Sequence, residues 1–516
     1  MKSTFTIVMC LCLWNLHGQS TFTYTVDEDF TTATMLSGIG GVWDIHNLDD
    51  GGFFLGGKMN PQVGGDENSP FVQGLGIVTS NGSLHPDWVN GGITWALQIF
   101  DHQGGYLIPT GQVLSKHEYS GESWYLTQGE TWGDYYLLGE FGSGWDNPYN
   151  VASTWDIFIQ EDQSVLIGGA IATDTLQPGL FRHLMRLLPD GSHDDSFPII
   201  EAMPQDFNSY ISKIEKASDG SWYVSGWFEG INGHYSPHVA HLTEDFEVDT
   251  DFVSPLIYAP NFNTTHAQMR YLDSQDRIWV SGVRVFLEDN PTDTLSLLRL
   301  LPDGQLDSSF EPRKIKVDYP ISWDNNARSW IIDIEENQSF PGHYFLGGFF
   351  NYYDDTLANC IAVVDDQGYI QENYFQGDGA TENQYHLDNP DIYRIPAIIA
   401  IEQLPDGSLM LGGGFSEFMG VERYHLVKLN QGTVGTQDQD RLSSPLKIYP
   451  NPASTILRWN KQAEKVELYD MVGKCVLDKE LIDSRNELLL DGISPGLYSI
   501  VFHTEIGAII KKLVVQ

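Results

Sequence analysis

The chain has 516 residues, with 28 Lys and Arg against 70 Asp and Glu, and its net charge is −42 at pH 7. A surface of this sign repels nucleic acid and anionic membranes, which both need a basic footprint, so neither is expected as a partner. The length exceeds what one compact core usually holds, and we expect a large domain followed by a smaller one.

Residues 1–18 have the features of a secretory signal peptide. Lys2 supplies the basic start, an almost wholly apolar run covers residues 5–14, and Gly18 is a small residue at the end. The run is too short to cross a bilayer, and no later segment is long and apolar enough to do so. We therefore expect an exported protein without a transmembrane helix.

A strand-like run that ends at glycine occurs seven times within residues 19–432. The clearest copies start at an Asp-Gly turn, and successive glycines lie 54, 58, 57, 56, 66 and 65 residues apart. Asp-Gly supplies the positive φ of a tight hairpin, and the aromatic and β-branched residues after it suit a buried, pleated surface. The closing glycine suits a bulge or a close approach of two backbones. The series is Gly57, Gly111, Gly169, Gly226, Gly282, Gly348 and Gly413.

A second signature follows in most units: an apolar strand, an Asp-Gly or Asn-Gly turn, an acidic residue and an aromatic. Residues 187–197 and 300–310 are the two best-matched copies. The regular recurrence indicates that the aromatics pack between adjacent sheets rather than stack on sugars. The aspartates are expected to form turns, with calcium ligation by a minority of them as the alternative. The aromatic series is Phe30, Trp88, Trp145, Phe197, Phe252, Phe310 and Phe375.

The repeat predicts an all-β fold, a seven-bladed β-propeller with four short strands in each unit. Residues 25–30 repeat the aromatic ending of a unit, and the last unit lacks that ending after residue 432. We therefore expect the strand near residues 21–30 to pair beside residues 421–430 and to close the ring.

Two sequence patterns in the repeats, PDGxxDxSF and DGSLxLGGxF, resemble the delta-60 repeat of secreted β-propeller-like proteins. The resemblance covers roughly residues 20–432. It implies a repeat fold, and it implies no common activity.

Residues 433–445 are polar and predict an exposed linker, and the short alternating strands of residues 446–516 predict a small antiparallel β-sandwich. Four motifs in this segment resemble the type A sorting domain of the type IX secretion system. The residues that carry the resemblance are Tyr449, Pro450, Asn451, Pro452, Tyr469, Asp470, Gly473, Gly496, Leu497, Tyr498, Lys511 and Lys512.

The sorting-domain resemblance implies a route and partners. The signal peptide would direct export through the inner membrane of a Gram-negative bacterium, and the type IX machinery would carry the protein across the outer membrane. A sorting protease would then remove the domain, for which the exposed linker is the expected site. The remaining protein would be anchored at the cell surface or released.

Signatures of catalysis and cofactor binding are absent from the sequence. It contains no Walker loop, HExxH pair, nucleophile elbow or cysteine pair at metal spacing, so we assign no catalytic, cofactor-binding or metal-binding residue. His234, His238 and His241 form one close group, but strand geometry would point His241 away from the other two, and a surface loop is expected. Cys360 and Cys475 lie in separate domains and are expected to be buried rather than disulfide-bonded.

These observations favour a secreted or cell-surface module that binds a glycan or a protein without catalysis. The alternative is a secreted hydrolase of polysaccharides that uses carboxylates at the mouth of the propeller channel. A third interpretation is an adhesion module whose acidic loops bind calcium. Acidic side chains that converge in one pocket with shifted pKa values would favour the hydrolase. Specificity is expected where the units differ, first of all in residues 101–150.

Overall fold

The computed structural model divides into two units, Met1–Thr433 and Val434–Gln516. The described residues contain no helix, and therefore no helix that is long and apolar enough to cross a membrane. The predicted signal peptide lies outside the described residues, and so does the predicted linker except for its first residue, Thr433, which ends the last strand of the propeller. The structure describes residues 22–31, 41–59, 73–85, 98–109, 114–119, 124–125, 153–172, 181–204, 209–258, 266–317, 329–371, 374–375, 379–381, 396–433, 448–449, 453, 456–459, 463, 465–470, 474–480, 487–490, 492–504 and 507–515.

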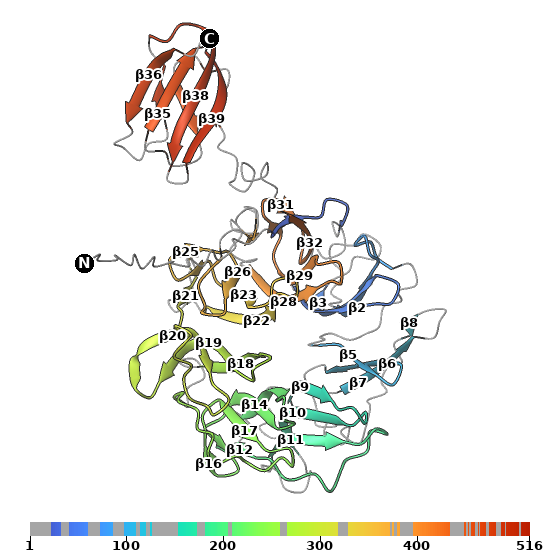
Figure 1. The fold of residues 1–516 in the computed structure, drawn as a ribbon. Helices are drawn as coiled ribbons and strands as arrows, with labels where there is room; N and C mark the ends of the chain where they lie inside the picture. Colours follow the sequence, from blue (N-terminus) through green and yellow to red (C-terminus); the bar gives the residue numbers. More distant parts are fainter. Residues whose placement is uncertain are drawn as a thin grey trace, which may run out of the picture. The chain divides into compact units, whose positions relative to one another are not determined.

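Unit 1 is a β-propeller, as the repeat predicts. Among its described residues, seven antiparallel sheets follow one another along the chain and surround a common centre (Figure 1). The first three sheets contain β2 (Gly41–Asn47), β3 (Phe53–Met59) and β4 (Gln73–Val78); β5 (Phe100–His102), β6 (Gly105–Pro109), β7 (Leu114–Tyr119) and β8 (Trp124–Tyr125); and β9 (Ser153–Ile159), β10 (Val165–Ala172) and β11 (Phe181–Leu187). The fourth, fifth and sixth sheets contain β13 (Tyr210–Lys216), β14 (Trp222–Trp227) and β17 (Val239–Leu242); β18 (His266–Leu272), β19 (Ile278–Leu287) and β20 (Asn290–Leu300); and β22 (Trp330–Glu336), β23 (His343–Phe349) and β26 (Ile361–Asp365). The seventh sheet contains β28 (Ala397–Gln403), β29 (Leu409–Gly414), β32 (Leu426–Thr433) and β1 (Phe22–Val26).

Three small ribbons of two-residue strands accompany these sheets. They contain β12 (Ala202–Met203), β15 (Gly230–Ile231) and β16 (His234–Tyr235); β21 (Ile315–Lys316), β24 (Tyr352–Tyr353) and β25 (Thr356–Leu357); and β27 (Ala380–Thr381), β30 (Glu417–Phe418) and β31 (Val421–Glu422).

The described repeat glycines lie in the second strand of their sheets. At Gly226, an added Cβ atom would lie 2.0 Å from the carbonyl oxygen of Tyr210 on the neighbouring strand. A Cβ atom added at Gly57, Gly348 or Gly413 would likewise lie 2.0–2.2 Å from a carbonyl oxygen of the neighbouring strand. Real Cβ contacts are never so short, so the glycine is needed for the close approach of two backbones. Gly169 lies in β10 and Gly282 in β19, and Gly111 lies outside the described residues.

The N-terminal strand closes the last sheet. β1 pairs antiparallel with β32, with Val26 opposite Leu429 and Thr25 opposite Asn430. Beyond the strand, the Asp27 amide donates to the Lys428 carbonyl oxygen at 2.9 Å, and the two side chains form an ion pair at 3.5 Å. This is the pairing that the aromatic ending near residue 30 predicts.

The described aromatics of the second signature pack where one sheet meets the next. Phe197 follows β11 and contacts Phe246 of the next unit, with ring centroids 4.7 Å apart. Phe30 and Phe53 meet in the same way at 6.2 Å. Phe30, Phe197, Phe252 and Phe310 are buried, Phe375 is partly buried, and Trp88 and Trp145 lie outside the described residues.

The expectation of four strands in each unit is wrong for most sheets, which have three among the described residues. After the third strand, the chain makes single bridges around a tight turn, such as Leu187 with His193 and Leu300 with Leu306. The turn aspartate explains the short pairing: Asp190 Oδ1 accepts the Ser192 amide at 3.0 Å, which bends the backbone instead of extending the strand.

Unit 2 consists of two antiparallel sheets that share one apolar core. The core includes Trp459, Val466, Phe502 and Leu513, which come from both sheets. The short strands β34 and β37 were not expected from the sequence. One sheet contains β33 (Ile448–Tyr449), β34 (Ile456–Trp459) and β37 (Glu487–Leu489); the other contains β36 (Cys475–Glu480), β35 (Lys465–Asp470), β38 (Gly496–Thr504) and β39 (Gly507–Val515).

Candidate functional site

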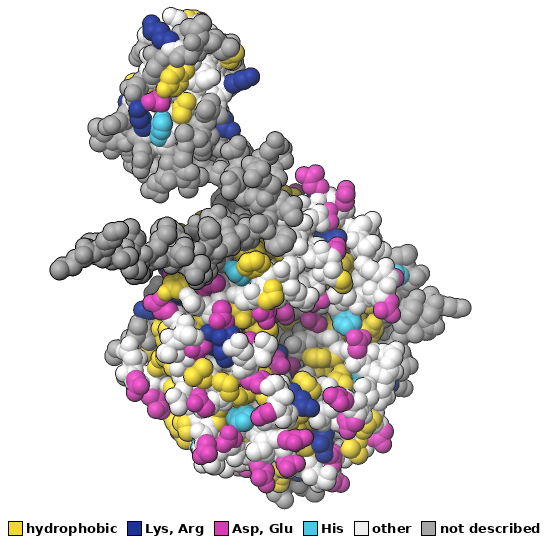
Figure 2. Space-filling model, viewed as in Figure 1, with side chains coloured by type: hydrophobic (Ala, Val, Ile, Leu, Met, Phe, Trp, Pro, Cys, Tyr) yellow, Lys and Arg dark blue, Asp and Glu magenta, His cyan; other side chains and the backbone are white. Residues whose placement is uncertain are grey.

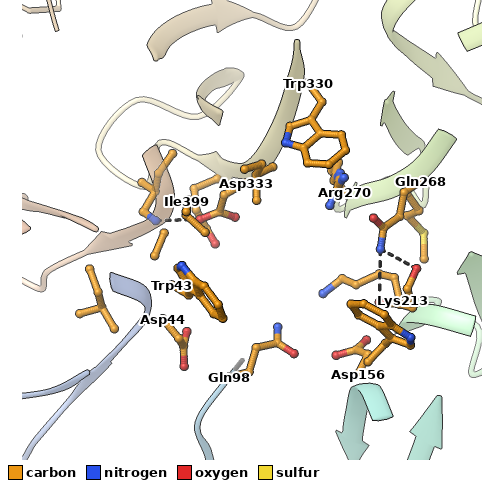
Figure 3. Close-up of a pocket in the computed structure, with 18 of the residues that line it drawn as sticks. Trp43, Asp44, Gln98, Asp156, Lys213, Gln268, Arg270, Trp330, Asp333 and Ile399 are labelled. Atoms are coloured by element: carbon orange, nitrogen blue, oxygen red, sulfur yellow. Dashed lines mark hydrogen bonds between the residues drawn. The ribbon is translucent and has the colours of Figure 1, made fainter. Parts of the chain in front are cut away.

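The centre of unit 1 holds a cavity of about 710 Å³. Its walls come from the first strand of six sheets, β2, β9, β13, β18, β22 and β28, together with Gln98 just before β5. Figure 3 shows Trp43, Gln98 and Lys213 reaching toward the middle of this space from three sides. A cavity of this volume, walled by rings and a few polar groups, is typical of a small-molecule site.

A β-bulge in each of these first strands places a side chain in the cavity wall. In β2 the register shifts between Val42 and Asp44, so Trp43 is the extra residue opposite the glycine-containing strand. Bulges commonly redirect side chains beside functional sites. The same shift makes Trp155, Ser212, Ile332 and Ile399 the extra residues in β9, β13, β22 and β28, and all four line the cavity.

Three aspartates that follow a bulge join neighbouring sheets. Asp44 Oδ2 accepts the backbone amide of Ile99 at 2.6 Å, and Asp156 Oδ2 accepts that of Ile214 at 2.7 Å. In the β22 sheet, Asp333 Oδ2 accepts the Ile401 amide at 2.7 Å. These carboxylates satisfy backbone donors that would otherwise be buried without a partner.

The β13 and β18 sheets make the equivalent link with serine. Ser225 Oγ accepts the Met269 amide at 2.8 Å, and Ser281 Oγ accepts the Ile331 amide at 3.0 Å. Because serine does this in other sheets, the first role of the three cavity aspartates is to hold the ring together.

Burial raises the pKa values of the cavity carboxyls. It raises the pKa of Asp44 to about 7 and those of Asp156 and Asp333 to about 6, although the backbone hydrogen bonds oppose the rise. For Glu335, burial and the nearby Asp333 and Glu402 raise the pKa to about 8. The pKa of Glu402 is also raised by burial. Near pH 7, Glu335 is therefore mostly neutral and Asp44 about half neutral, whereas Asp156 and Asp333 lose their charge at lower pH.

Two cations lie among these carboxyls. Lys213 Nζ forms an ion pair with Glu215 at 2.8 Å, and Glu215 and Asp156 hold its pKa above the usual value although burial opposes the charge. Arg270 forms no ion pair with any residue that the structure describes, and its Nε is shielded from solvent without a hydrogen-bond partner there. Burial lowers its pKa to about 10, so the guanidinium is charged at neutral pH.

Aromatic rings form much of the remaining wall. The indole of Trp155 stacks on the ring of Tyr210, with centroids 5.2 Å apart and an angle of 25° between the planes. Trp155 is nevertheless 42% exposed, which is unusual for a tryptophan in a rigid strand. Trp330 and Phe349 form an edge-to-face pair at 6.1 Å, and Trp43 contributes a further ring.

A second constellation, away from the cavity, has the connectivity of a catalytic triad. His241 Nε2 lies 2.7 Å from Ser221 Oγ, and His241 Nδ1 lies 2.9 Å from Asp249 Oδ2. A serine hydroxyl has one hydrogen, however, and Ser221 Oγ also lies 2.5 Å from Asp219 Oδ1, a carboxylate that can only accept. Asp219 therefore competes with His241 for this one hydrogen, which argues against activation of Ser221 as a nucleophile.

The serine–aspartate contact of Ser221 recurs in other hairpins of the propeller. Ser164 donates to Asp162 at 2.6 Å, Ser192 donates to Asp190 at 2.6 Å, and Ser408 donates to Asp406. The contacts around Ser221 and His241 therefore stabilise a hairpin turn and do not form a nucleophile site.

The three clustered histidines act separately. His234 Nε2 lies 3.1 Å from the Phe252 carbonyl oxygen, whereas His241 contacts Ser221 and Asp249. His238 is 1% exposed with both ring nitrogens against carbonyl oxygens, and burial lowers its pKa to about 4. The expectation of a surface loop is wrong for His238, because its side chain fills the space beside the repeat glycine.

Two further sequence interpretations concern the burial of Cys360 and the alternative that some aspartates bind calcium. Cys360 is buried, with Sγ 3.0 Å from the Pro396 carbonyl oxygen. Within the described ranges, no group of three or more His, Cys, Asp or Glu side chains is arranged to hold a metal ion. Figure 2 shows carboxylates spread over this face of unit 1 rather than gathered in one patch.

The expected sorting-domain residues fall on the strands of unit 2. Gly496, Leu497 and Tyr498 begin β38, Tyr469 and Asp470 end β35, Tyr449 ends β33, and Lys511 and Lys512 lie in β39. Tyr498 donates from its hydroxyl to the Ser494 carbonyl oxygen at 2.7 Å. The remaining motif residues, Pro450, Asn451, Pro452 and Gly473, lie outside the described residues.

Comparison with protein families identifies both parts of the chain. Residues 447–516 match the secretion system C-terminal sorting domain. Unit 2 contains a sorting domain of the type IX secretion system. Residues 217–252, 283–310 and 404–438 match the beta-propeller domain of unknown function DUF5122. The chain is thus a type IX-exported propeller protein, carried to the cell surface or secreted.

Solved structures with similar folds are distant in sequence. PorZ, a surface component of the type IX secretion system of Porphyromonas gingivalis, is 13% identical with a TM-score of 0.39, covering 95% of this chain and 61% of its own. The extracellular domain of BT4673 from B. thetaiotaomicron is 11% identical with a TM-score of 0.37, covering 96% of this chain and 60% of its own. The chain thus spans about three-fifths of these proteins. No curated protein matches the chain.

The sequence interpretation did not find the cavity, although one signal was present. The tripeptide Trp-Asp-Ile occurs at residues 43–45 and again at residues 155–157, in the same strand of two sheets. A tryptophan that recurs beside a buried aspartate on an inner strand is a pattern that could have indicated the cavity wall.

Proposed function

We propose that this exported propeller binds a carbohydrate in its central cavity and does not hydrolyse it. The observation that carries the proposal is the wall itself, in which exposed Trp155 and its stacked partner Tyr210 lie beside carboxyl and amide groups. The C–H face of a sugar ring packs on an aromatic face, while its hydroxyl groups need donors and acceptors around the edge.

The electrostatics support binding rather than catalysis. Three of the five cavity carboxyls, Asp44, Asp156 and Asp333, are already committed to backbone amides of adjoining sheets. A glycosidase needs two carboxyl groups that are free to exchange protons with the substrate. The committed groups are thereby poorly suited to that chemistry.

A hydrolase is the second candidate, and a specific observation favours it. Glu335 has a pKa raised to about 8, the state required of a general acid, and Glu402 lies near enough to contribute to that rise. Glu335 would be the acid and Glu402 the nucleophile or base. Both residues line the cavity, which supports this second candidate.

The test is a glycan and polysaccharide binding screen on the full chain, with product analysis of every ligand found. Binding without products that is weakened about tenfold or more by Trp155→Ala supports the proposal. Release of shortened sugars that stops in Glu335→Gln would establish the hydrolase instead. Binding that is unaffected by Trp155→Ala would place the ligand outside the cavity and refute the proposal.

A further inference from the structure

The side chain of Arg270 is partly buried, and its guanidinium has no counter-ion among the described residues. It stands on the bulge of β18, encircled by the other inner strands, and Figure 3 shows it directed into the cavity between Trp330 and Gln268. Its Nε is shielded from solvent and meets no described acceptor. A buried charge is costly unless it is paired, so the site favours an anion beside Arg270.

The other cation of the cavity, Lys213, already has an ion-pair partner, so Arg270 is the better candidate to bind an anion. Lys213 already has Glu215 at 2.8 Å, whereas the nearest acidic influence on Arg270 is Asp333, with which it makes no ion pair. Asp333 is itself engaged by the Ile401 amide. No described residue therefore supplies the planar pair of acceptors that a guanidinium binds best.

The acidic residues of the cavity repel an anion less strongly as the pH falls. The described charged groups that line the cavity with Arg270 are Asp44 on β2, Asp156 on β9, Lys213 on β13, Asp333 and Glu335 on β22, and Glu402 on β28; Glu215 on β13 is the ion-pair partner of Lys213. Four of these carboxyls have pKa values raised to about 6–8, so most of their negative charge is lost by about pH 5.5, while Arg270 keeps its positive charge.

We propose that the cavity takes a sugar that carries a carboxylate, such as a uronic acid, and that Arg270 binds the carboxylate. The inference rests on the proposed function and names its ligand class. The sugar ring would lie on an aromatic wall of the cavity, where Trp155 and Trp330 offer faces. The Gln98 amide, which can both donate and accept, would bind hydroxyl groups, and Gln268 would accept through Oε1 while its Nε2 donates to Ser212 at 2.6 Å.

The experiment is calorimetric titration of the full chain with trimers of galacturonic, glucuronic and mannuronic acid and with the methyl ester of each trimer. The ester keeps the sugar ring and removes only the charge. At least one free acid should bind about 10- to 100-fold more tightly than its ester. In Arg270→Gln the acid should fall to the affinity of the ester, and Arg270→Lys should lie between.

Two further variants separate the cavity from general electrostatics. Trp155→Ala should weaken acid and ester alike. Lys316→Gln removes a cation that is 56% exposed at the surface and should change neither. The affinity for the acid should also rise as the pH falls from 8 to 5.5, because the cavity carboxyls become neutral while Arg270 and the uronate stay charged. Melting curves of Arg270→Gln and Arg270→Lys show whether the variants are folded.

The outcomes distinguish the two proposals. If every acid binds no better than its ester, and Arg270→Gln binds both as the parent does, the carboxylate inference is wrong and a neutral sugar remains the ligand. If Trp155→Ala also leaves all binding unchanged, or no sugar in the panel binds, the cavity is not a carbohydrate site and both proposals fail.

Discussion

In four of the units, a single glycine determines how closely the two inner strands of a sheet approach each other. At Gly226 the carbonyl oxygen of Tyr210 occupies the place of a Cβ atom, and the strand opposite carries the bulge that exposes Ser212 to the cavity. The residue that maintains the repeat is thereby also the residue that shapes the cavity wall.

Replacing this glycine should destabilise the propeller. Gly226→Ala places a methyl group 2.0 Å from a backbone oxygen, and the strands must separate to accept it. We expect a loss of about 1–3 kcal/mol in the free energy of unfolding. The control is Gly432→Ala, whose nearest neighbour would be at 3.6 Å. Urea unfolding of both variants checks this, and equal stability of the two would contradict the steric argument.

The cavity aspartates should make stability depend on pH. Burial raises the pKa of Asp44 to about 7 from an unfolded value of 3.8. A group that holds its proton more tightly when folded stabilises the protein below pH 4, and this stabilisation is lost as the pH rises from 4 to 7. At about 1.4 kcal/mol per pKa unit, the loss is of the order of 2–4 kcal/mol.

Asp44→Asn isolates this effect. Its amide oxygen can still accept a hydrogen bond from the Ile99 backbone amide, but the side chain no longer titrates. The free energy of unfolding of the variant should fall less steeply between pH 4.5 and 7 than that of the parent. Asp190→Asn, in an exposed turn where Ser192 lowers the pKa, should leave the slope in that range unchanged. A slope that does not change in Asp44→Asn would show that Asp44 titrates normally.

The strand β1 is the element on which closure of the propeller depends. It joins residues 22–26 to residues 429–433, and Tyr24 fills the junction with a ring that is 1% exposed. The Tyr24 ring meets that of Phe345 at 5.7 Å, so the closing strand also covers the neighbouring sheet. Loss of this pairing would expose the edge of β32.

A disulfide across this pair should form and stabilise the ring. Thr25 and Asn430 are directly opposite in the register, and neither is buried. Thr25→Cys with Asn430→Cys, in a chain that carries Cys475→Ser, should oxidise and raise the free energy of unfolding by up to about 5 kcal/mol through the long loop it closes. Thr25→Cys with Lys428→Cys is two residues out of register and should stay reduced. Mobility on non-reducing gels shows which of the two cysteine pairs forms a disulfide. A disulfide in the Thr25–Lys428 pair but not in the Thr25–Asn430 pair would contradict the strand register.

At the scale of the whole molecule, the sequence predicts what repeats and misses what does not. The glycines, the aromatic packing positions and the closing strand follow from a local pattern copied along the chain. The cavity comes from single positions on six strands spread over more than 350 residues, and the bulged side chains differ in type from Trp43 to Arg270. Nothing in a linear pattern brings them together, and residues 101–150, expected to carry specificity, lie largely outside the described residues.

The charge also separates along the molecule. Residues 19–441 hold 18 Lys and Arg against 61 Asp and Glu, a net charge of −43, whereas the remainder from Leu442 has nine of each. The large negative charge thus lies in the propeller segment, whereas the sorting-domain segment is neutral overall.

Removing unit 2 should separate export from folding. Unit 1 has its own apolar clusters and its closing strand, and its last strand ends at Thr433, so a chain truncated after that residue keeps every sheet of the propeller. We expect this chain to melt within about 2 °C of unit 1 in the parent and to bind sugars equally, because single domains fold independently.

In the native cell, the truncated chain should stay inside the outer membrane, because the sorting domain is missing. Fractionation of cells and medium measures this, with the parent chain as control. A truncated chain at the cell surface would show that another segment directs export, and an unfolded one would show that the two units fold together.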